Sequence, residues 1–301
     1  MLRPLLFATV PLAMTACSPV PPSAQRAPMT WDDLTSRTRP VPDAEVRYGD
    51  DPYQVVDLWR PKGDGPFPTV LMVHGGCWTT SIADRMLMAW IADDLRGRGI
   101  AVWNIDYRGV DRPGGGYPGT FEDAAKAADA LRANATRYNL DISRIVAVGH
   151  SAGGHLALWL AGRPKLPDDS RLRTADPLPI ASVVSLGGLP DLEQARTEEQ
   201  GCGAEVIDQL VGPRELSSRH VYRDTSIPWL APLGVAQTLI NGDSDRIIPT
   251  HFAADYAAKM ERAGDRVTVE IVPGQGHVEL IAPDSPAWAR ARAAIERALG
   301  R

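Results

Sequence analysis

The chain has 301 residues, of which 44% are hydrophobic and 23% charged, and these proportions are ordinary for a globular enzyme. They exclude a disordered chain and a membrane helix bundle, and the length allows one large α/β domain or two smaller ones. The 32 basic and 37 acidic residues give a net charge of −5 without a basic stripe, so we expect no nucleic-acid partner. No His-Glu-x-x-His or Cys-x-x-Cys cluster is present, so we expect neither a metal nor another cofactor.

The first residues have the pattern of an export signal. Arg3 precedes an apolar run over residues 5–13, which is too short to span a bilayer but is typical of a signal-peptide core. The run closes with residues 14–17 (MTAC), which resemble the bacterial lipobox, with methionine where leucine is usual. We therefore predict a signal peptide over residues 1–16 and a lipid anchor on Cys17, the only membrane contact expected. An ordinary secretory signal with an incidental Cys17 is the alternative, and both would export the chain.

Residues 17–42 are rich in proline, serine, threonine and alanine, as is typical of a flexible tether. The residue after Cys17 is Ser18 and not aspartate. By the resemblance to lipobox proteins, this residue favours anchoring in the outer membrane. We therefore expect an exported protein of the bacterial cell envelope or periplasm, anchored in the outer membrane. In this oxidising compartment Cys77 and Cys202 form an even pair that a disulfide can join, and two unrelated buried thiols are the alternative.

Residues 43–301 alternate strand and helix patterns. Two opening strands separated by Gly49-Asp50-Asp51 predict an antiparallel pair. The βα alternation after them predicts a mostly parallel sheet with helices on both faces, because parallel strands need crossover connections. Between residues 189 and 232 the periodicity breaks down, which predicts a small lid insertion. Strands are predicted over residues 45–48, 54–59, 69–74, 101–105, 145–148, 180–186, 235–241 and 266–272. Helices are predicted over residues 84–98, 120–138, 151–162, 250–262 and 286–299.

A serine between a predicted strand and a predicted helix is the first candidate for chemistry. The apolar run 145–148 leads into residues 149–153 (GHSAG), a Gly-x-Ser-x-Gly pattern, and a helix-forming run follows at once. At such a turn the glycines lack the Cβ atoms that would clash, so the serine hydroxyl projects beyond the sheet edge. The pattern predicts a nucleophile elbow with Ser151 as the nucleophile of a hydrolase.

This nucleophile needs a neighbouring base, because a free serine hydroxyl is hardly ionised at neutral pH. Of the six histidines, His277 lies in a loop directly after a predicted strand and before the last predicted helix. The carboxyl ends of parallel strands converge on one edge of the sheet, so this loop can reach Ser151. A local packing or hydrogen-bonding role is expected for His74, His150 and His155. His220 lies in the region where the periodicity breaks down, and His251 opens a predicted helix.

A carboxylate must hold this imidazole in the right tautomer and stabilise it when protonated. Residues 241–249 (NGDSDRIIP) follow the preceding predicted strand. They resemble the Gly-x-x-Asp-x-x-Val-Pro loop of α/β hydrolases, which aligns Asp245 with the acid and Asp243 with a turn-capping residue. Asp191, after an earlier strand, is a third candidate. With Asp245 the chain order is Ser, Asp, His, the order associated with the α/β-hydrolase fold.

Acyl transfer also needs N–H donors for the negative charge that develops on the carbonyl oxygen. The N–H of Ala152, just after the nucleophile, is one expected donor. Residues 74–78 (HGGCW) follow an earlier strand and resemble the His-Gly-Gly-Gly motif of esterases, which aligns Gly76 and Cys77 with further donors. A plain tight turn is the alternative. A disulfide between Cys77 and Cys202 would fix this loop to the insertion.

Together these motifs resemble the α/β-hydrolase superfamily, specifically the bacterial esterase-like branch with His-Gly-Gly-x-Trp. This branch includes kynurenine formamidase-like proteins and relatives of the hormone-sensitive-lipase group. The resemblance covers about residues 41–299 and implies an α/β-hydrolase fold. The chain departs from the pattern at Cys77, where glycine is usual, and at Asn241, where histidine often precedes the glycine.

The resulting prediction is a serine hydrolase that cleaves a small-molecule carboxylic ester through an acyl-enzyme, with the triad Ser151, Asp245 and His277. An amide or formamide hydrolase and an exported peptidase are alternatives that share this triad. Such a peptidase usually carries a large gating domain, for which the chain has no room. A non-catalytic envelope binding protein on a hydrolase fold is the alternative from another class. The oligomeric state is left open.

Overall fold

The computed structural model describes residues 27–212 and 220–301. The predicted signal peptide over residues 1–16, the candidate lipidation site Cys17 and the first part of the predicted tether lie outside the described residues. Within the two described ranges, no helix is both long enough and apolar enough to cross a membrane.

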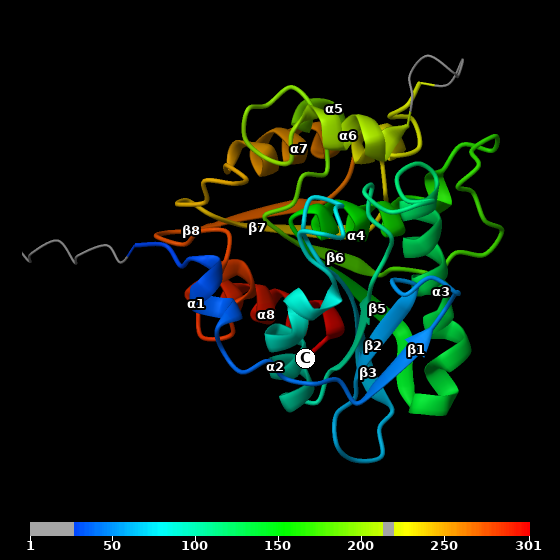
Figure 1. The fold of residues 1–301 in the computed structure, drawn as a ribbon, viewed down its shortest axis with the longest axis vertical. Helices are drawn as coiled ribbons and strands as arrows, with labels where there is room; N and C mark the ends of the chain where they lie inside the picture. Colours follow the sequence, from blue (N-terminus) through cyan, green and yellow to red (C-terminus); the bar gives the residue numbers. More distant parts are fainter. Residues whose placement is uncertain (1–26, 213–219) are drawn as a thin grey trace, which may run out of the picture.

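The described residues form an eight-stranded sheet in the order β1-β2-β4-β3-β5-β6-β7-β8 (Figure 1). β2 pairs antiparallel with both β1 and β4, and the remaining neighbours are parallel. Each predicted strand overlaps one of these strands, which confirms the predicted opening pair and the mostly parallel sheet. The strands are β1 (Ala44–Arg47), β2 (Val55–Trp59), β3 (Phe67–Val73), β4 (Ala101–Ile105), β5 (Leu140–His150), β6 (Ser182–Leu186), β7 (Ala236–Gly242) and β8 (Val267–Val272).

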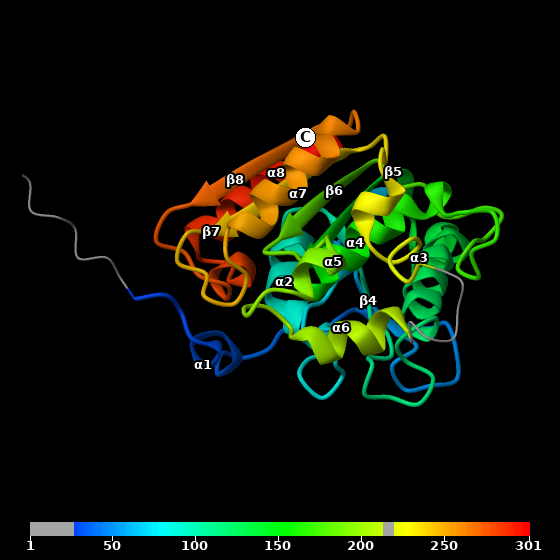
Figure 2. The same cartoon turned by 90° about the horizontal axis from the view of Figure 1, so that it is seen from above.

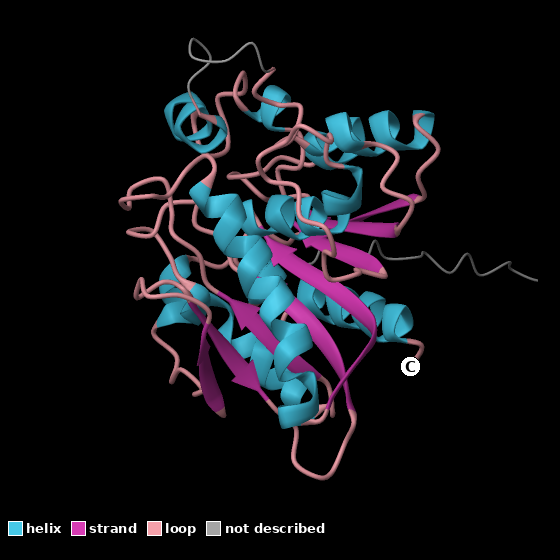
Figure 3. Cartoon of the chain, turned by 90° about the vertical axis from the view of Figure 1, so that its right-hand side faces the viewer, coloured by secondary structure: helices cyan, strands magenta, loops and turns pink. Residues whose placement is uncertain are grey.

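Helices cover both faces of this sheet (Figures 2 and 3). Helices α3, α4 and α7 pack on one face, and α2 and α8 pack on the other. Side chains alternate between the faces along each strand: in β3, Leu71 and Val73 face the first set of helices, and Val70 and Met72 face the second. The α-helices are α1 (Trp31–Thr35), α2 (Ala89–Gly97), α3 (Gly119–Tyr138), α4 (Ala152–Gly162), α5 (Leu192–Ala195), α6 (Ala204–Val211), α7 (His251–Arg262) and α8 (Pro286–Leu299); the 3-10 helices are η1 (Arg85–Met88), η2 (Arg163–Lys165), η3 (Ile227–Leu230) and η4 (Glu279–Ile281).

Helix α8 has the predicted bounds because both of its ends carry strong capping residues. The Ser285 side chain accepts a hydrogen bond from the Trp288 N–H, and Pro286 occupies the first helical position, where its missing N–H costs nothing. Gly300 ends the helix with φ of 80°, a left-handed conformation that glycine adopts without strain. The helix predicted over residues 84–98 is instead split into η1 and α2.

The described part of the predicted tether differs from the prediction, because it lies against the domain. We call residues 27–38 the N-terminal strap. Thr30 and Asp33 form a capping box at the start of α1, and Leu34 of this helix is fully buried. At the end of the strap, the Trp90 Nε1–H donates to the Thr38 carbonyl oxygen at 3.2 Å. A single buried leucine produces no apolar periodicity, so the sequence pattern did not reveal this packing.

The predicted insertion over residues 189–232 contains α5, α6 and η3 in its described part. Its buried residues include Leu189, Leu192 and Ile207, which belong to the same apolar cluster as α3, α4 and α7. Arg196, just after α5, pairs with Asp208 of α6, with Nε and Oδ1 2.7 Å apart. The described residues of the insertion therefore pack on the domain as short helices joined by loops.

Candidate active site

Ser151 lies at the sharp turn between β5, which ends at His150, and α4, which begins at Ala152. Its φ of 54° and ψ of −124° are rare for a residue with a Cβ atom, and such a conformation costs of the order of 1–3 kcal/mol. A Cβ atom on Gly149 would lie 2.0 Å from the Gly153 carbonyl oxygen. Only glycine at position 149 therefore permits this turn, which holds the serine at the carboxyl end of the central strand.

Asp245 and His277 form a buried pair on the two loops that follow β7 and β8. The His277 Nδ1 lies 2.7 Å from Asp245 Oδ2, and the two side chains are only 4% and 0% exposed. The other carboxylate oxygen, Oδ1, accepts the N–H groups of Ile247 and Ile248, both at 2.8 Å. Because a carboxylate only accepts hydrogen bonds, His277 donates through Nδ1, which leaves Nε2 as the ring atom that can accept a proton.

The other two candidate acids do not contact His277. Asp243 accepts a hydrogen bond from the Gly274 N–H at 2.7 Å, and its side chain therefore joins the two loops. Asp191 caps α5 through the N–H groups of its first turn and pairs with Lys259. Of the three aspartates considered from the sequence, the structure brings only Asp245 to the imidazole.

His150, next to Ser151 in the chain, contacts His277 directly. The two ring centroids are 4.4 Å apart, and the His150 Nε2–H donates to the His277 carbonyl oxygen at 3.1 Å. Burial, followed by the nearby rings of His277 and His74, lowers the pKa of His150 well below its usual range. His150 is therefore a neutral donor that ties the histidine loop to the serine turn, a role more specific than the general one expected from the sequence.

His74 belongs to a buried polar network under the HGGCW loop that sequence reasoning did not predict. Its Nε2 lies 3.0 Å from Asp106 Oδ1, and its ring stacks on Tyr107 with 4.3 Å between centroids. Arg85 donates to the other Asp106 oxygen at 3.0 Å and to Asp57 at 2.8 Å. Arg85 and the two aspartates are paired and largely buried, so the network connects the start of the loop, through His74, to β2 and to the end of β4.

The loop itself presents consecutive residues with positive φ: 105° at Gly76, 50° at Cys77 and 51° at Trp78. Among the hydrogen bonds of the described residues, the N–H groups of Gly76 and Cys77 have no acceptor. Ala152 is the first residue of α4, and N–H groups in the first turn of a helix lack intrahelical partners. These three N–H groups are therefore the candidates for binding a ligand oxygen.

A disulfide joins Cys77 to Cys202, with 5.3 Å between the two Cα atoms, a separation typical of disulfides. Cys202 lies between α5 and α6. The bond therefore attaches the HGGCW loop to the insertion. It joins the two cysteines that the sequence analysis gave as a possible disulfide pair.

Comparison with known proteins agrees with this architecture. Residues 56–260 match the model of the family described as BD-FAE. The chain belongs to the BD-FAE family. This membership confirms the resemblance to α/β-hydrolase esterases that the sequence motifs indicated.

Named relatives of this BD-FAE chain include esterases from bacteria and fungi. It is 30% identical over 265 residues to esterase LipC of Mycobacterium tuberculosis, which covers 85% of this chain and 64% of the relative. It is 32% identical over 253 residues to versiconal hemiacetal acetate esterase of Dothistroma septosporum. This match covers 76% of this chain and 72% of the relative. The chain spans about half to two thirds of the length of the first curated relatives.

A truncated carbohydrate esterase from gut microbiota has a similar solved structure, with a TM-score of 0.72 and 21% sequence identity. The match covers 92% of this BD-FAE chain and 100% of that chain. At this low identity the similarity concerns the fold, and it confirms the predicted α/β-hydrolase fold.

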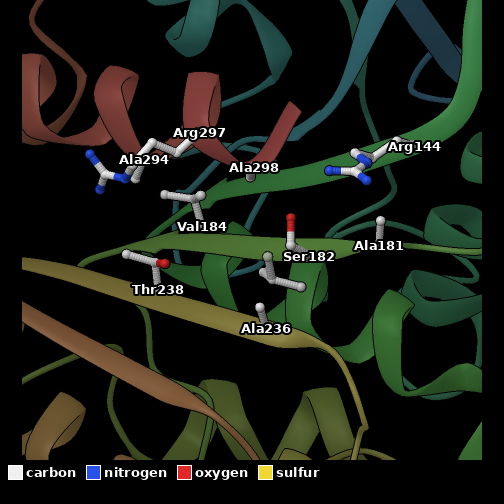
Figure 4. Close-up of a pocket in the computed structure, with 10 residues that line it drawn as sticks. Arg144, Ala181, Ser182, Val184, Ala236, Thr238, Ala294, Arg297 and Ala298 are labelled. Carbon is white, nitrogen blue, oxygen red and sulfur yellow. The ribbon is translucent and has the colours of Figure 1, made fainter. Parts of the chain in front are cut away.

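Two hollows lie at opposite ends of the sheet of this BD-FAE protein. One, of about 450 Å³, is lined by His277, by residues next to it and by the N-terminal strap. The other, of about 470 Å³, is lined by Ser182 at the start of β6, Ala236 at the start of β7 and Arg297 near the end of α8 (Figure 4). The second hollow is remote from the candidate active site, because Ser151 and His277 follow the carboxyl ends of strands. Within the described ranges, no cluster of three or more His, Cys, Asp or Glu residues could hold a metal ion.

His155 of α4 is expected to make this BD-FAE domain sensitive to acid. Burial lowers its pKa from 6.5 to about 4, although its hydrogen bond to the Thr225 carbonyl oxygen acts in the opposite direction. Below pH 6.5 the unfolded chain binds a proton that the folded protein excludes, so stability falls as pH falls toward 4. Between pH 7 and pH 5 this one group should lower the free energy of unfolding by about 2 kcal/mol.

Urea unfolding of the parent and of His155→Gln at the two pH values measures this effect. Glutamine keeps a donor for Thr225 but does not titrate, so the loss of stability between pH 7 and pH 5 should be smaller in the variant by about 2 kcal/mol. Equal losses in both proteins would show that the charge on His155 does not control acid stability.

Proposed function

We propose that this protein is a serine hydrolase that cleaves carboxylic esters of small molecules through an acyl-enzyme, with Ser151, His277 and Asp245 as the catalytic triad. The observation that carries the proposal is the buried hydrogen bond of 2.7 Å between His277 and Asp245, on a loop that His150 ties to the serine turn. A serine with φ of 54° at the start of a helix supplies the nucleophile.

In the proposed mechanism, His277 Nε2 takes the proton of the Ser151 hydroxyl as its Oγ attacks the ester carbonyl carbon. Asp245 keeps the imidazole in the required tautomer and stabilises its protonated form. His277 then gives the proton to the leaving alcohol oxygen, and the bond between that oxygen and the carbonyl carbon breaks. A water molecule, deprotonated by His277, hydrolyses the acyl-enzyme in the second half of the reaction.

The N–H groups of Gly76, Cys77 and Ala152 are proposed to bind the negative oxygen of the tetrahedral intermediates. Each such donor is worth about 3–4 kcal/mol when it points at the developing charge. Ala152 adds the positive end of the α4 dipole. The His74–Asp106–Arg85 network supports the loop from below, which keeps the donors in place before the substrate binds.

Ester substrates are favoured over amides, formamides or peptides because the named relatives are esterases. LipC is named as an esterase, and the Dothistroma septosporum relative is named for an acetate ester. An Arabidopsis thaliana relative is named as a probable methylesterase. These names support a small-molecule ester and leave its identity to experiment.

A fluorophosphonate probe together with p-nitrophenyl acetate tests the proposal. We expect the purified protein to release p-nitrophenol and to incorporate one phosphonyl group, located on Ser151 by peptide mass spectrometry. Folded protein that does neither would instead support a non-catalytic binding protein.

Export and lipidation at Cys17 are also part of the proposal. The Cys77–Cys202 disulfide supports an oxidising compartment such as the periplasm. In bacterial cells grown with labelled palmitate, the full chain is expected to take up label in the membrane fraction, whereas Cys17→Ser is expected to be unlabelled. A parent protein without label, released in soluble form from the periplasm, would show that residues 1–16 act as an ordinary secretory signal.

A further inference from the structure

The N-terminal strap lies directly beside the candidate catalytic histidine. Trp31, in the first turn of α1, contacts both His150 and His277 edge-on, with 6.2 Å between ring centroids in each case. Its side chain is not buried in the core, because the residue is 37% exposed. Figure 1 shows α1 next to the loops that lead from β8 to α8. An exposed aromatic ring therefore stands at the edge of the triad.

A buried carboxylate fixes the strap to the histidine loop. Glu279 accepts the Met29 N–H through Oε1 at 2.5 Å and the Gly276 N–H through Oε2 at 3.0 Å, and it is only 5% exposed. A second attachment is the ion pair between Arg37 and Asp284, with 2.7 Å between nitrogen and oxygen. The strap and the loop that carries His277 are thus connected as one unit.

The strap and the two triad loops line an open pocket of about 450 Å³. The strap contributes residues 27–31, the acid loop contributes residues on either side of Asp245, and the histidine loop contributes His277 and its neighbours. Most of the side chains that shape the pocket are apolar. They include Pro28, Met29, Trp31, Ile247 and Val278.

We infer that this pocket is the leaving-group subsite of the enzyme and that it takes a bulky apolar or aromatic alcohol. The inference rests on the proposed function, since it assigns a role to His277 as the acid that protonates the leaving oxygen. That oxygen must come within hydrogen-bond distance of the imidazole in the step that breaks the ester bond. The rest of the alcohol must then lie next to His277.

The position of the oxyanion donors supports the same assignment. The carbonyl oxygen binds at Gly76, Cys77 and Ala152, and this side of the site is attached to the insertion through Cys202. The alcohol lies on the side of His277, where the strap supplies the apolar wall. An aromatic alcohol can meet the Trp31 ring, and contact between aromatic rings is favourable beyond the area buried.

The test separates the alcohol from the acyl group. The parent, Trp31→Ala and Ile247→Ala are compared on methyl butyrate and 1-naphthyl butyrate, which share the acyl group, and on p-nitrophenyl acetate, butyrate and octanoate, which share the alcohol. Ile271→Ala is the matched control, because Ile271 is an isoleucine of β8 that is 40% exposed and does not line the pocket. Thermal unfolding shows that each variant is folded.

We expect Trp31→Ala and Ile247→Ala to lower kcat/KM for 1-naphthyl butyrate about tenfold relative to methyl butyrate, with an unchanged ranking of the three acyl chains. Ile271→Ala should match the parent on every ester. Equal losses on the methyl and naphthyl esters, a changed acyl ranking, or no loss at all would overturn the subsite.

Binding of 1-naphthol, measured by calorimetry, provides a readout that does not need turnover. It should weaken about tenfold in Trp31→Ala and be unchanged in Ile271→Ala. If the parent neither turns over methyl butyrate nor reacts with the fluorophosphonate, the proposed function fails, whatever the naphthol result. If the parent is active but 1-naphthol binds the parent and Trp31→Ala equally, only the leaving-group subsite fails.

Discussion

Ser151→Ala is expected to lower kcat for p-nitrophenyl acetate by about 10⁴- to 10⁶-fold, because no acyl-enzyme can form without the hydroxyl. The substitution removes one oxygen atom and keeps the Cβ atom. The turn with φ of 54° and the hydrogen bond from the Ser151 N–H to the Leu186 carbonyl oxygen, at 2.8 Å, should therefore persist. Initial rates, with circular dichroism to check folding, measure the effect.

Asp245→Asn tests the other end of the triad in the same assay. The amide can reach His277 but favours the wrong tautomer, so kcat is expected to fall by about 10³- to 10⁴-fold. Asp243→Asn is the matched control, because Asp243 lies two residues away, is exposed and uses its Oδ1 to accept the Gly274 N–H. Asparagine can still accept that bond, so activity should be near that of the parent.

Ser151→Ala with the activity of the parent would refute the triad.

The parallel part of the sheet and the triad loops were predictable because short-range patterns encode them. β5 begins five residues before the predicted strand, yet its apolar end at residues 145–148 and the glycine-flanked turn were evident from the sequence. Asp245 and His277 each follow a strand, and the carboxyl ends of parallel strands share one edge. That rule places two loops together although the residues lie 32 positions apart in the chain.

The strap and the polar network could not be predicted, because they depend on contacts between distant segments. Met29 and Glu279 are 250 residues apart, and nothing near either residue indicates the other. Arg85 reaches Asp57 and Asp106 from a 3-10 turn that the pattern assigned to a helix. The amino-acid composition of residues 17–42 predicted a flexible tether. Composition averages over the whole segment, whereas a few buried groups, such as Leu34 and Glu279, hold the strap against the domain.

Cys202→Ser is expected to destabilise the protein and to slow catalysis. The disulfide joins residues 125 positions apart, and in the chain-entropy model a loop of this length contributes about 4–5 kcal/mol to stability. We therefore expect the free energy of unfolding to fall by about 3–5 kcal/mol. Urea unfolding of the purified, oxidised protein measures this loss.

The catalytic effect follows from the conformation of Cys77. Its φ of 50° costs of the order of 1–3 kcal/mol, and the disulfide is one of the contacts that oppose its relaxation. Once the bond is absent, the loop can leave the left-handed region and turn its N–H away from the carbonyl oxygen of the substrate. Because misplaced donors lose most of their value, we expect kcat to fall by about 10- to 100-fold with a smaller change in KM.

Reduction of the parent with dithiothreitol should reproduce both effects, and Cys202→Ser should not respond to the reductant. Cys77→Ser breaks the same bond at its other end, so it should match Cys202→Ser in stability if the lost connection is the cause. Thiol titration of the denatured, unreduced parent lacking Cys17 should detect no free thiol. Two free thiols, or a reduced protein with unchanged kcat and stability, would contradict this prediction. Either result would show that the HGGCW loop keeps its conformation without support from the insertion. The His74–Asp106–Arg85 network would then be sufficient to hold the loop.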